Sequence, residues 1–252
     1  MTGCFPSNHT KLLTLHTVVG AARFAAAREN SGVSAPLHTF LFADLAGFTA
    51  LTEAHGDEEA ADLIAVFCSE VRQMLPDHRA QEVKTIGDEL MIRTDNAADA
   101  VRLALRVVGE VGGRHGFPAV RAGLHTGPAV ARGDDWFGAT VNVASRVSRH
   151  ATAGEVLLTE ASRQAALDEL GDVELAPREP AQFKNVGQPV ELWAVLPEGQ
   201  GDERSPVEID PVCRMAVIPE RAFAAASHGD HTHHFCSQAC ADAFRDDPER
   251  YV

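Results

Sequence analysis

The sequence predicts an α+β fold in which helices cover a mainly antiparallel sheet. Three observations lead to this prediction. An apolar run over residues 37–44 ends in an acid, which is typical of a buried strand. Two short β-prone runs flank Gly87-Asp88, and apolar residues recur at helical spacing between these strands. We therefore expect the helices to pack on one face of the sheet.

After the strand over residues 37–44, two helices and a hairpin are expected up to about residue 112. A helical stretch opens near Gly47 and Thr49 and ends at Pro76, because its apolar residues follow one another three or four positions apart. Residues 82–86 and 89–93 predict a hairpin with a tight turn. Asn96 is predicted to cap a helix that runs to about Gly112.

The second half continues the alternation of strands and helices. We expect a strand over residues 119–125, a helix over 138–150, a strand over 155–158 and a helix over 161–170. Two late strands are predicted near 173–175 and 190–195.

Composition excludes several classes of protein. The 252 residues hold 36 acidic and 22 basic side chains, a net charge of −14, which argues against a nucleic-acid partner. A hydrophobic content of 45% excludes disorder throughout, and no apolar run is long enough for a membrane span. Five cysteines form an odd set that does not resemble a secreted disulfide framework, so we expect a reduced, cytoplasmic compartment.

Four segments are expected along the chain. Residues 1–36 form an N-terminal extension that can be helical over about 11–30, and residues 37–196 form the main domain. Residues 197–208 are polar and rich in Gly and Pro, which is typical of a linker. Residues 209–252 form a small module that concentrates Cys and His.

Four motifs in the main domain occur in a characteristic order. They are FADLAGFT at 42–49, VKTIGDELM at 83–91, RAGLHTG at 121–127 and DWFGATVNVASR at 135–146. With these motifs, residues 37–196 resemble a class III nucleotidyl cyclase catalytic domain, and the resemblance implies a ferredoxin-like α+β fold. Each motif alone is a weak signal, and their combination carries the resemblance.

Asp44 and Asp88 are the candidate metal ligands. Asp44 follows a buried strand and Asp88 lies in a predicted turn, so their carboxylates can hold hard cations such as Mg²⁺. The resemblance implies two Mg²⁺ or Mn²⁺ ions at these residues, which would activate an attacking oxygen and steady a leaving one. Without the Asp44 motif, Asp88 would fit an ordinary turn residue.

The resemblance gives roles to four further residues. It implies that Lys84 and Asp135 read adenine, whereas a Glu and a small polar or Cys residue would read guanine. Asn142 and Arg146 share a helix face four residues apart, and the resemblance implies that Asn142 positions the ribose and Arg146 stabilises charge on the α-phosphate. Without the resemblance, Lys84 would be interpreted as an ordinary surface lysine on a hairpin.

All six residues occur in one chain. Given the resemblance, this implies a symmetric homodimer with active sites at its interface. The expected activity is that of an adenylate cyclase, which converts ATP into 3′,5′-cyclic AMP and pyrophosphate. Two alternatives stay open. One is a guanylate cyclase, and the other is a metal-sensing protein whose cyclase-like domain only binds nucleotide or dimerises.

The C-terminal segment resembles a YHS domain. The matching residues are DPVCRM at 210–215, FCSQAC at 235–240, Phe244 and PERY at 248–251, with Arg214 where a Gly is usual. So short a segment rarely folds without a metal, a disulfide or a partner. Cys213, Cys236 and Cys240 can hold Zn²⁺ or another soft metal. A nearby His would complete the site, and the sequence does not choose among His228, His231, His233 and His234.

Overall fold

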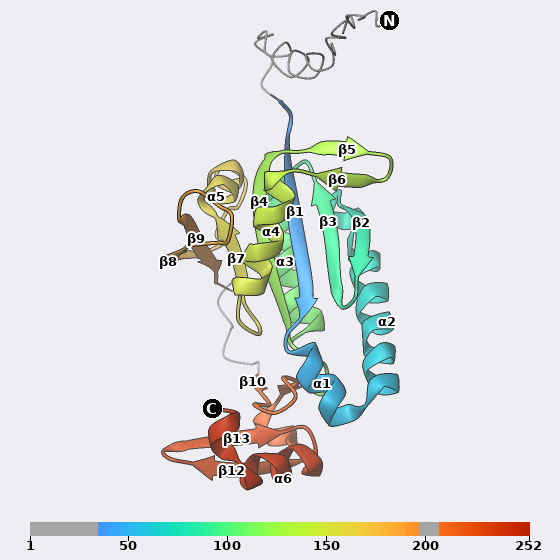
Figure 1. Cartoon of the computed structure of the whole chain (residues 1–252), viewed down its shortest axis with the longest axis vertical. Coiled ribbons are helices and arrows are strands. Elements are labelled where there is room, and N and C mark those ends of the chain that lie inside the picture. Colours follow the sequence, from blue (N-terminus) through green and yellow to red (C-terminus); the bar gives the residue numbers. More distant parts are fainter. Residues whose placement is uncertain (1–34, 197–206) are drawn as a thin grey trace, which may run out of the picture. The chain divides into compact units, whose positions relative to one another are not determined.

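The computed structural model describes residues 35–196 and 207–252 (Figure 1). The described residues from 36 onward form one compact unit. Its main element is a seven-stranded sheet in which all neighbours are antiparallel except β4 and β7. In spatial order the strands are β2 (Gln81–Ile86), β3 (Glu89–Thr94), β1 (Leu37–Leu45), β4 (Val120–Pro128), β7 (Val156–Thr159), β9 (Val190–Val195) and β8 (Leu175–Ala181).

Five helices belong to the main domain. They are α1 (Phe48–His55), α2 (Asp57–Met74), α3 (Ala97–Arg106), α4 (Ala139–His150) and α5 (Glu160–Ala166). A 3₁₀ turn over Pro76–His78 follows α2, and a π-helical turn over Val107–Val111 extends α3. Asn96 caps α3 as predicted, since its side chain accepts a hydrogen bond from the backbone N–H of Asp99.

The expectation that the helices share one face of the sheet is wrong. Figure 1 shows α4 and α3 on opposite faces. The reason is that β1 is buried on both sides. Its Leu41 and Ala43 pack with α2 and α3, whereas Phe40 and Phe42 pack against Ala144 of α4. The uninterrupted apolar run of β1 is therefore a two-sided core strand.

Other boundaries differ from the predictions in three places. The helical stretch before Pro76 is two helices, because Gly56 adopts a φ of +88° between α1 and α2. The late strand predicted at 173–175 lies instead at Leu175–Ala181. This edge strand holds two prolines, Pro177 and Pro180, which an edge tolerates because half of its N–H groups need no partner. A short hairpin of β5 (Val130–Arg132) and β6 (Asp135–Phe137) was not predicted.

The C-terminal module contains two small hairpins and one helix. Its elements are β10 (Glu208–Ile209), β11 (Ala216–Val217), β12 (Ala224–His228), β13 (His231–Phe235) and α6 (Gln238–Asp246), with 3₁₀ turns at Pro219–Arg221 and Pro248–Arg250. Its apolar core includes Phe235, Phe244 and Leu51, and Leu51 belongs to α1. A β-bridge pairs Met215 with Pro118 of the main domain. The module therefore shares both core and backbone hydrogen bonds with the main domain.

The predicted N-terminal helix and the linker residues 197–206 lie outside the described residues. Within residues 35–196 and 207–252, no helix has the length and apolar character that crossing a membrane requires.

Candidate active site

Strand register brings three charged side chains together at the end of β1. Asp44 lies opposite Glu89 of β3 on one side and opposite Arg121 of β4 on the other. Arg121 donates from Nε and Nη2 to Oδ2 of Asp44, at 2.8 and 2.5 Å. Asp44 is 6% exposed, so this two-point hydrogen bond balances a carboxylate held largely away from water.

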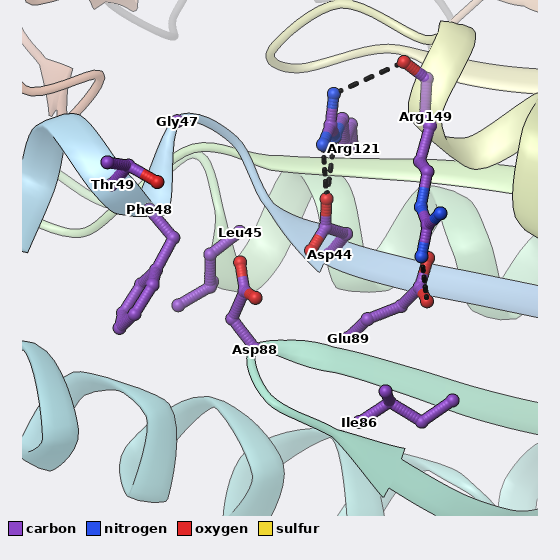
Figure 2. Close-up of a pocket in the computed structure, with 10 residues that line it drawn as sticks. All are labelled: Asp44, Leu45, Gly47, Phe48, Thr49, Ile86, Asp88, Glu89, Arg121 and Arg149. Atoms are coloured by element: carbon purple, nitrogen blue, oxygen red, sulfur yellow. Dashed lines mark hydrogen bonds and ion pairs between the residues drawn. The ribbon is translucent and has the colours of Figure 1, made fainter.

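Asp88 approaches the same point from the turn between β2 and β3. Gly87 has a φ of +64°, which lets the two strands reverse direction within two residues. Asp88 and Asp44 line one cavity of about 300 Å³. Figure 2 shows the side chains that line it. Burial and the neighbouring charge of Asp44 raise the pKa of Asp88 to about 6.

Glu89 is the third carboxylate at this site. It was not among the candidate residues predicted from the sequence. It is 4% exposed, and its Oε1 has no hydrogen-bond partner among the residues that the structure describes. Its Oε2 lies 3.5 Å from Nη2 of Arg149 (Figure 2). Burial raises the pKa of Glu89 to about 7. The pairing of Glu89 with Asp44 across the strands could be foreseen only once the register of β1 and β3 was known.

The donor set fits a hard divalent cation. Three carboxylates converge on one cavity, one carries an unpartnered buried oxygen, and two have raised pKa values. Oxygen ligands of this kind are those that Mg²⁺ and Mn²⁺ prefer. A bound cation would offset the mutual repulsion of the carboxylates and supply a partner to Glu89.

Lys84 and Asp135 meet at a second place. A register shift between Glu82 and Lys84 marks a bulge in β2, which changes the direction of the strand there. Nζ of Lys84 donates to Oδ2 of Asp135 at 2.7 Å, and Oδ1 of Asp135 accepts from the backbone N–H of Trp136. The hydrogen bonds from Lys84 and Trp136 lower the pKa of Asp135, which favours its ionised form.

Asn142 and Arg146 lie on α4, as predicted, with Asn142 exposed and Arg146 half-buried. The opposite face of α4 packs on β4 at very short range. A Cβ added at Gly123 would lie 1.9 Å from the backbone nitrogen of Ser148, and one at Gly127 would lie 2.7 Å from Oγ1 of Thr140. The two glycines of the RAGLHTG motif therefore allow α4 to pack closely on the sheet, because a side chain at either position would clash with the helix.

The six predicted residues thus form separate groups within one chain. Asp44 and Asp88 line the carboxylate cavity. Lys84 pairs with Asp135, and Asn142 and Arg146 are on α4. None of these four residues lines that cavity.

The three predicted cysteine ligands lie together, and the structure adds a histidine that the sequence did not suggest. Ligand atoms of Cys213, Cys236, Cys240 and His55 all lie within 4.8 Å of one another. His55 is the last residue of α1 in the main domain. None of the four tail histidines belongs to this group. His234 pairs with Glu208, His228 pairs with Glu249, and His233 packs against Phe244.

Comparison with known proteins agrees with this description. Residues 35–196 match the model of the adenylate and guanylate cyclase catalytic domain, and residues 208–252 match the YHS domain. Because the first match covers well over half of the chain, the protein belongs to the adenylate and guanylate cyclase catalytic domain family, and it carries a C-terminal YHS domain.

Several relatives carry the name adenylate cyclase. A pH-sensitive adenylate cyclase of Mycobacterium tuberculosis is 40% identical over 134 residues, which are 53% of this chain and 32% of that protein. An adenylate cyclase of Streptomyces griseus is 38% identical over 117 residues, 46% of this chain and 29% of that protein. The chain therefore matches about a third of the length of these relatives.

Solved structures show the same fold. An adenylate cyclase of Trypanosoma brucei, solved in its monomeric state, aligns with a TM-score of 0.60 at 23% identity and covers 64% of this chain and 89% of its own. An adenylate/guanylate cyclase/hydrolase of Silicibacter pomeroyi aligns with a TM-score of 0.59 at 25% identity over 64% of this chain and 97% of its own.

Proposed function

We propose that the protein is an adenylate cyclase that converts ATP into 3′,5′-cyclic AMP and pyrophosphate. The observation that carries this proposal is the convergence of Asp44, Asp88 and Glu89 on one cavity within a cyclase-family fold. In the reaction, the ribose 3′-hydroxyl oxygen bonds to the α-phosphorus. The bond from that phosphorus to the bridging oxygen breaks, pyrophosphate leaves, and the proton of the 3′-hydroxyl group passes to solvent.

The metal ligands of this proposal are Asp44 and Asp88. These carboxylates would hold two divalent cations, which would make the attacking oxygen more nucleophilic and offset the charge on the leaving phosphate. Glu89 borders the cavity and adds negative charge to it, while Arg121 holds Asp44 in place. Arg121 therefore orients a ligand and need not touch the nucleotide.

The choice of ATP rests on Lys84 and Asp135. Their 2.7 Å contact places a fixed donor beside a fixed acceptor. Adenine offers a ring nitrogen that accepts from an ammonium and an amino group that donates to a carboxylate. Guanine presents a carbonyl oxygen in place of that amino group, which would face Asp135 unfavourably.

We further propose that two chains assemble each active site. Asn142 would hold the ribose and Arg146 would neutralise charge that develops on the α-phosphate, as permanent guanidinium charge allows. In one chain these residues do not line the carboxylate cavity. A symmetric homodimer would supply both halves and would form two equivalent sites.

The C-terminal module is proposed to regulate the catalytic domain. Arg214 lies against Gly47, in the turn that leads from Asp44 to α1. The backbone N–H of Ala46 donates to Ala119, whose own N–H donates to the carbonyl oxygen of Arg214. Through these contacts, a change in the module can reach the segment that carries Asp44.

The test is an assay of the purified 252-residue chain with ATP or GTP, and with Mg²⁺ or Mn²⁺. We expect cyclic AMP from ATP and little cyclic GMP from GTP. A preference for GTP would replace the proposal with a guanylate cyclase. If neither nucleotide gives a cyclic product while the protein still binds ATP, the domain is a nucleotide-binding module instead.

A further inference from the structure

A cluster of three sulfur atoms and one imidazole nitrogen lies where the module meets α1. Sγ of Cys236 is 3.4 Å from Sγ of Cys213 and 3.8 Å from Sγ of Cys240. Nε2 of His55 lies 3.6 Å from the same Cys236 sulfur. The sulfurs come from the β10–β11 turn, the end of β13 and helix α6, and the nitrogen comes from the end of α1.

These separations match the edges of a tetrahedral zinc site. With Zn–S bonds near 2.3 Å and a tetrahedral angle, two sulfur ligands lie about 3.8 Å apart. A sulfur and an imidazole nitrogen at about 2.05 Å from zinc lie about 3.5 Å apart by the same geometry. The observed distances of 3.4, 3.8 and 3.6 Å therefore leave room for one cation at the centre.

The surroundings orient each ligand. Nδ1 of His55 lies 3.4 Å from a carboxylate oxygen of Glu59, which directs the Nε2 lone pair toward the sulfurs. Buried Asp210 accepts backbone hydrogen bonds from Val212, Cys213 and Cys236 and so fixes the two loops that carry sulfur. Ser237 caps α6 and accepts from the N–H of Cys240.

We infer that Cys213, Cys236, Cys240 and His55 bind one zinc-like cation and that this metal joins the YHS module to helix α1 of the catalytic domain. Three thiolates and one imidazole in a tetrahedron are a donor set typical of Zn²⁺. Because four protein ligands leave no open position, the site is structural. It supplies to the short module some of the folding free energy that its small core lacks.

The fourth ligand distinguishes this site from one contained within the module. A ligand from the tail would stabilise the module alone. His55 instead ends a helix whose first residues, Phe48 and Thr49, line the carboxylate cavity. Metal binding would thus restrain α1 at its far end.

The test compares metal binding by the reduced wild-type chain of 252 residues with that of His55→Ala. Zinc content is measured after dialysis against limiting Zn²⁺, and Co²⁺ serves as a spectroscopic probe. We expect one ion per wild-type chain, an intense tetrahedral Co²⁺ spectrum and an X-ray absorption edge that fits three sulfurs and one nitrogen. His55→Ala should bind at least about 10-fold more weakly and give an altered spectrum, because water would replace imidazole.

Two matched histidine variants control for general effects. His115→Ala removes a catalytic-domain histidine that also contacts the module, through the N–H of Ile218, and is not in the cluster. His234→Ala removes a tail histidine that pairs with Glu208. Both should bind metal as the wild type does. Hydrogen exchange in residues 48–55 should slow on addition of Zn²⁺ in the wild type and in both controls, and stay unchanged in His55→Ala.

Three results would overturn the inference. One is a reduced wild-type protein that takes up no Zn²⁺ or Co²⁺. Another is a disulfide between Cys213 and Cys236 that persists under reducing conditions. The third is a His55→Ala variant with the affinity and the Co²⁺ spectrum of the wild type. None of these readouts depends on cyclase activity, so the inference can fail while the proposed function stands.

Discussion

Nζ of Lys84 and Oδ2 of Asp135 lie 2.7 Å apart, although 51 residues separate them in the sequence. The bulge in β2 and the β5–β6 hairpin together bring them into contact. Both side chains are partly exposed, at 39% and 32%, so a nucleotide base can reach them. This pair is the basis for the proposed preference for ATP.

Exchanging this pair should change which nucleotide is used. The variant Lys84→Glu with Asp135→Cys is expected to lower the kcat/KM for ATP and to raise the ratio of GTP to ATP use. A base-reading contact is worth about 1–3 kcal/mol by analogy with bidentate base contacts, which is roughly 5- to 150-fold. Lys184→Glu, at an exposed lysine, is the control and should leave the ratio unchanged. An unchanged ratio in the double variant would remove these residues from base recognition.

Loss of either metal carboxylate should abolish cyclisation. We expect Asp44→Ala and Asp88→Ala each to lower kcat by at least about 10²–10³ in Mg²⁺, since each removes a ligand beside the reacting phosphate. Asp134→Ala, in the exposed turn before Asp135, is the control. Circular dichroism checks the fold, because Asp44→Ala also leaves Arg121 without its partner. Near-normal activity in either variant would contradict the metal assignment.

Glu89 should make the metal-free protein less stable at neutral pH. Its pKa is near 7 when folded and near its ordinary value when unfolded, so the folded state holds the extra proton between these values. The stability of the wild type relative to Glu89→Gln should therefore fall as pH rises from about 4.5 to 7 and then level off. At pH 8 we expect Glu89→Gln to be more stable by about 1–3 kcal/mol.

Urea unfolding of the metal-free proteins at several pH values tests this expectation. Glu179→Gln, at an exposed position in β8, should show no such difference from the wild type. Mg²⁺ should reduce or reverse the advantage of Glu89→Gln, because the cation interacts favourably with the ionised carboxylate. Equal stability of Glu89→Gln and wild type at pH 8 without metal would show that Glu89 ionises without cost.

Arg214 should affect the catalytic domain more than the stability of its own module. Its φ is +66°, a conformation that glycine adopts without strain, and this explains why the YHS pattern usually has Gly here. Arg214→Gly should leave module stability unchanged or increase it by about 1 kcal/mol. The cyclase rate should nevertheless change, because the variant uncovers Gly47. Arg221→Ala, an exposed arginine of the module, is the control.

The rate and the thermal unfolding of Arg214→Gly are measured together. A rate equal to that of the wild type, in a folded protein, would argue against communication through this contact. Removal of the whole module after Leu196 tests this contact less directly, because the truncation also disturbs the main domain. It would expose Leu51, which has no exposed surface in the full chain, and would break the bridge between Pro118 and Met215.

Much of the fold could be predicted because local signals agreed with it. The apolar run of β1, the Asn96 cap and the Gly87-Asp88 turn are all local features, and the structure has each of them. The burial of β1 on both faces was missed, although an uninterrupted apolar run is typical of a strand covered on both sides. The edge strand β8 was predicted at the wrong residues because its prolines weaken the usual strand pattern.

The residues of the candidate sites were also predictable only in part. Asp44 and Asp88 stand in motifs and were predicted, and the structure places them in one cavity. Glu89 and Arg121 join them only through strand register, and His55 joins the cysteines only through contact between the domains. The sequence around His55 carries no metal-binding pattern. Its role depends on a contact with residues about 180 positions away, as in its approach to Cys236.

The central claim is that two chains build each active site, and a mixing experiment tests it most directly. Asp44→Ala lacks a metal ligand and Arg146→Ala lacks the proposed transition-state arginine, so each homodimer should be inactive. A mixed dimer would contain one site with both lesions and one with neither. After subunit exchange, random pairing should restore about a quarter of wild-type activity. No recovery, with exchange shown by differently tagged chains, would contradict the shared site.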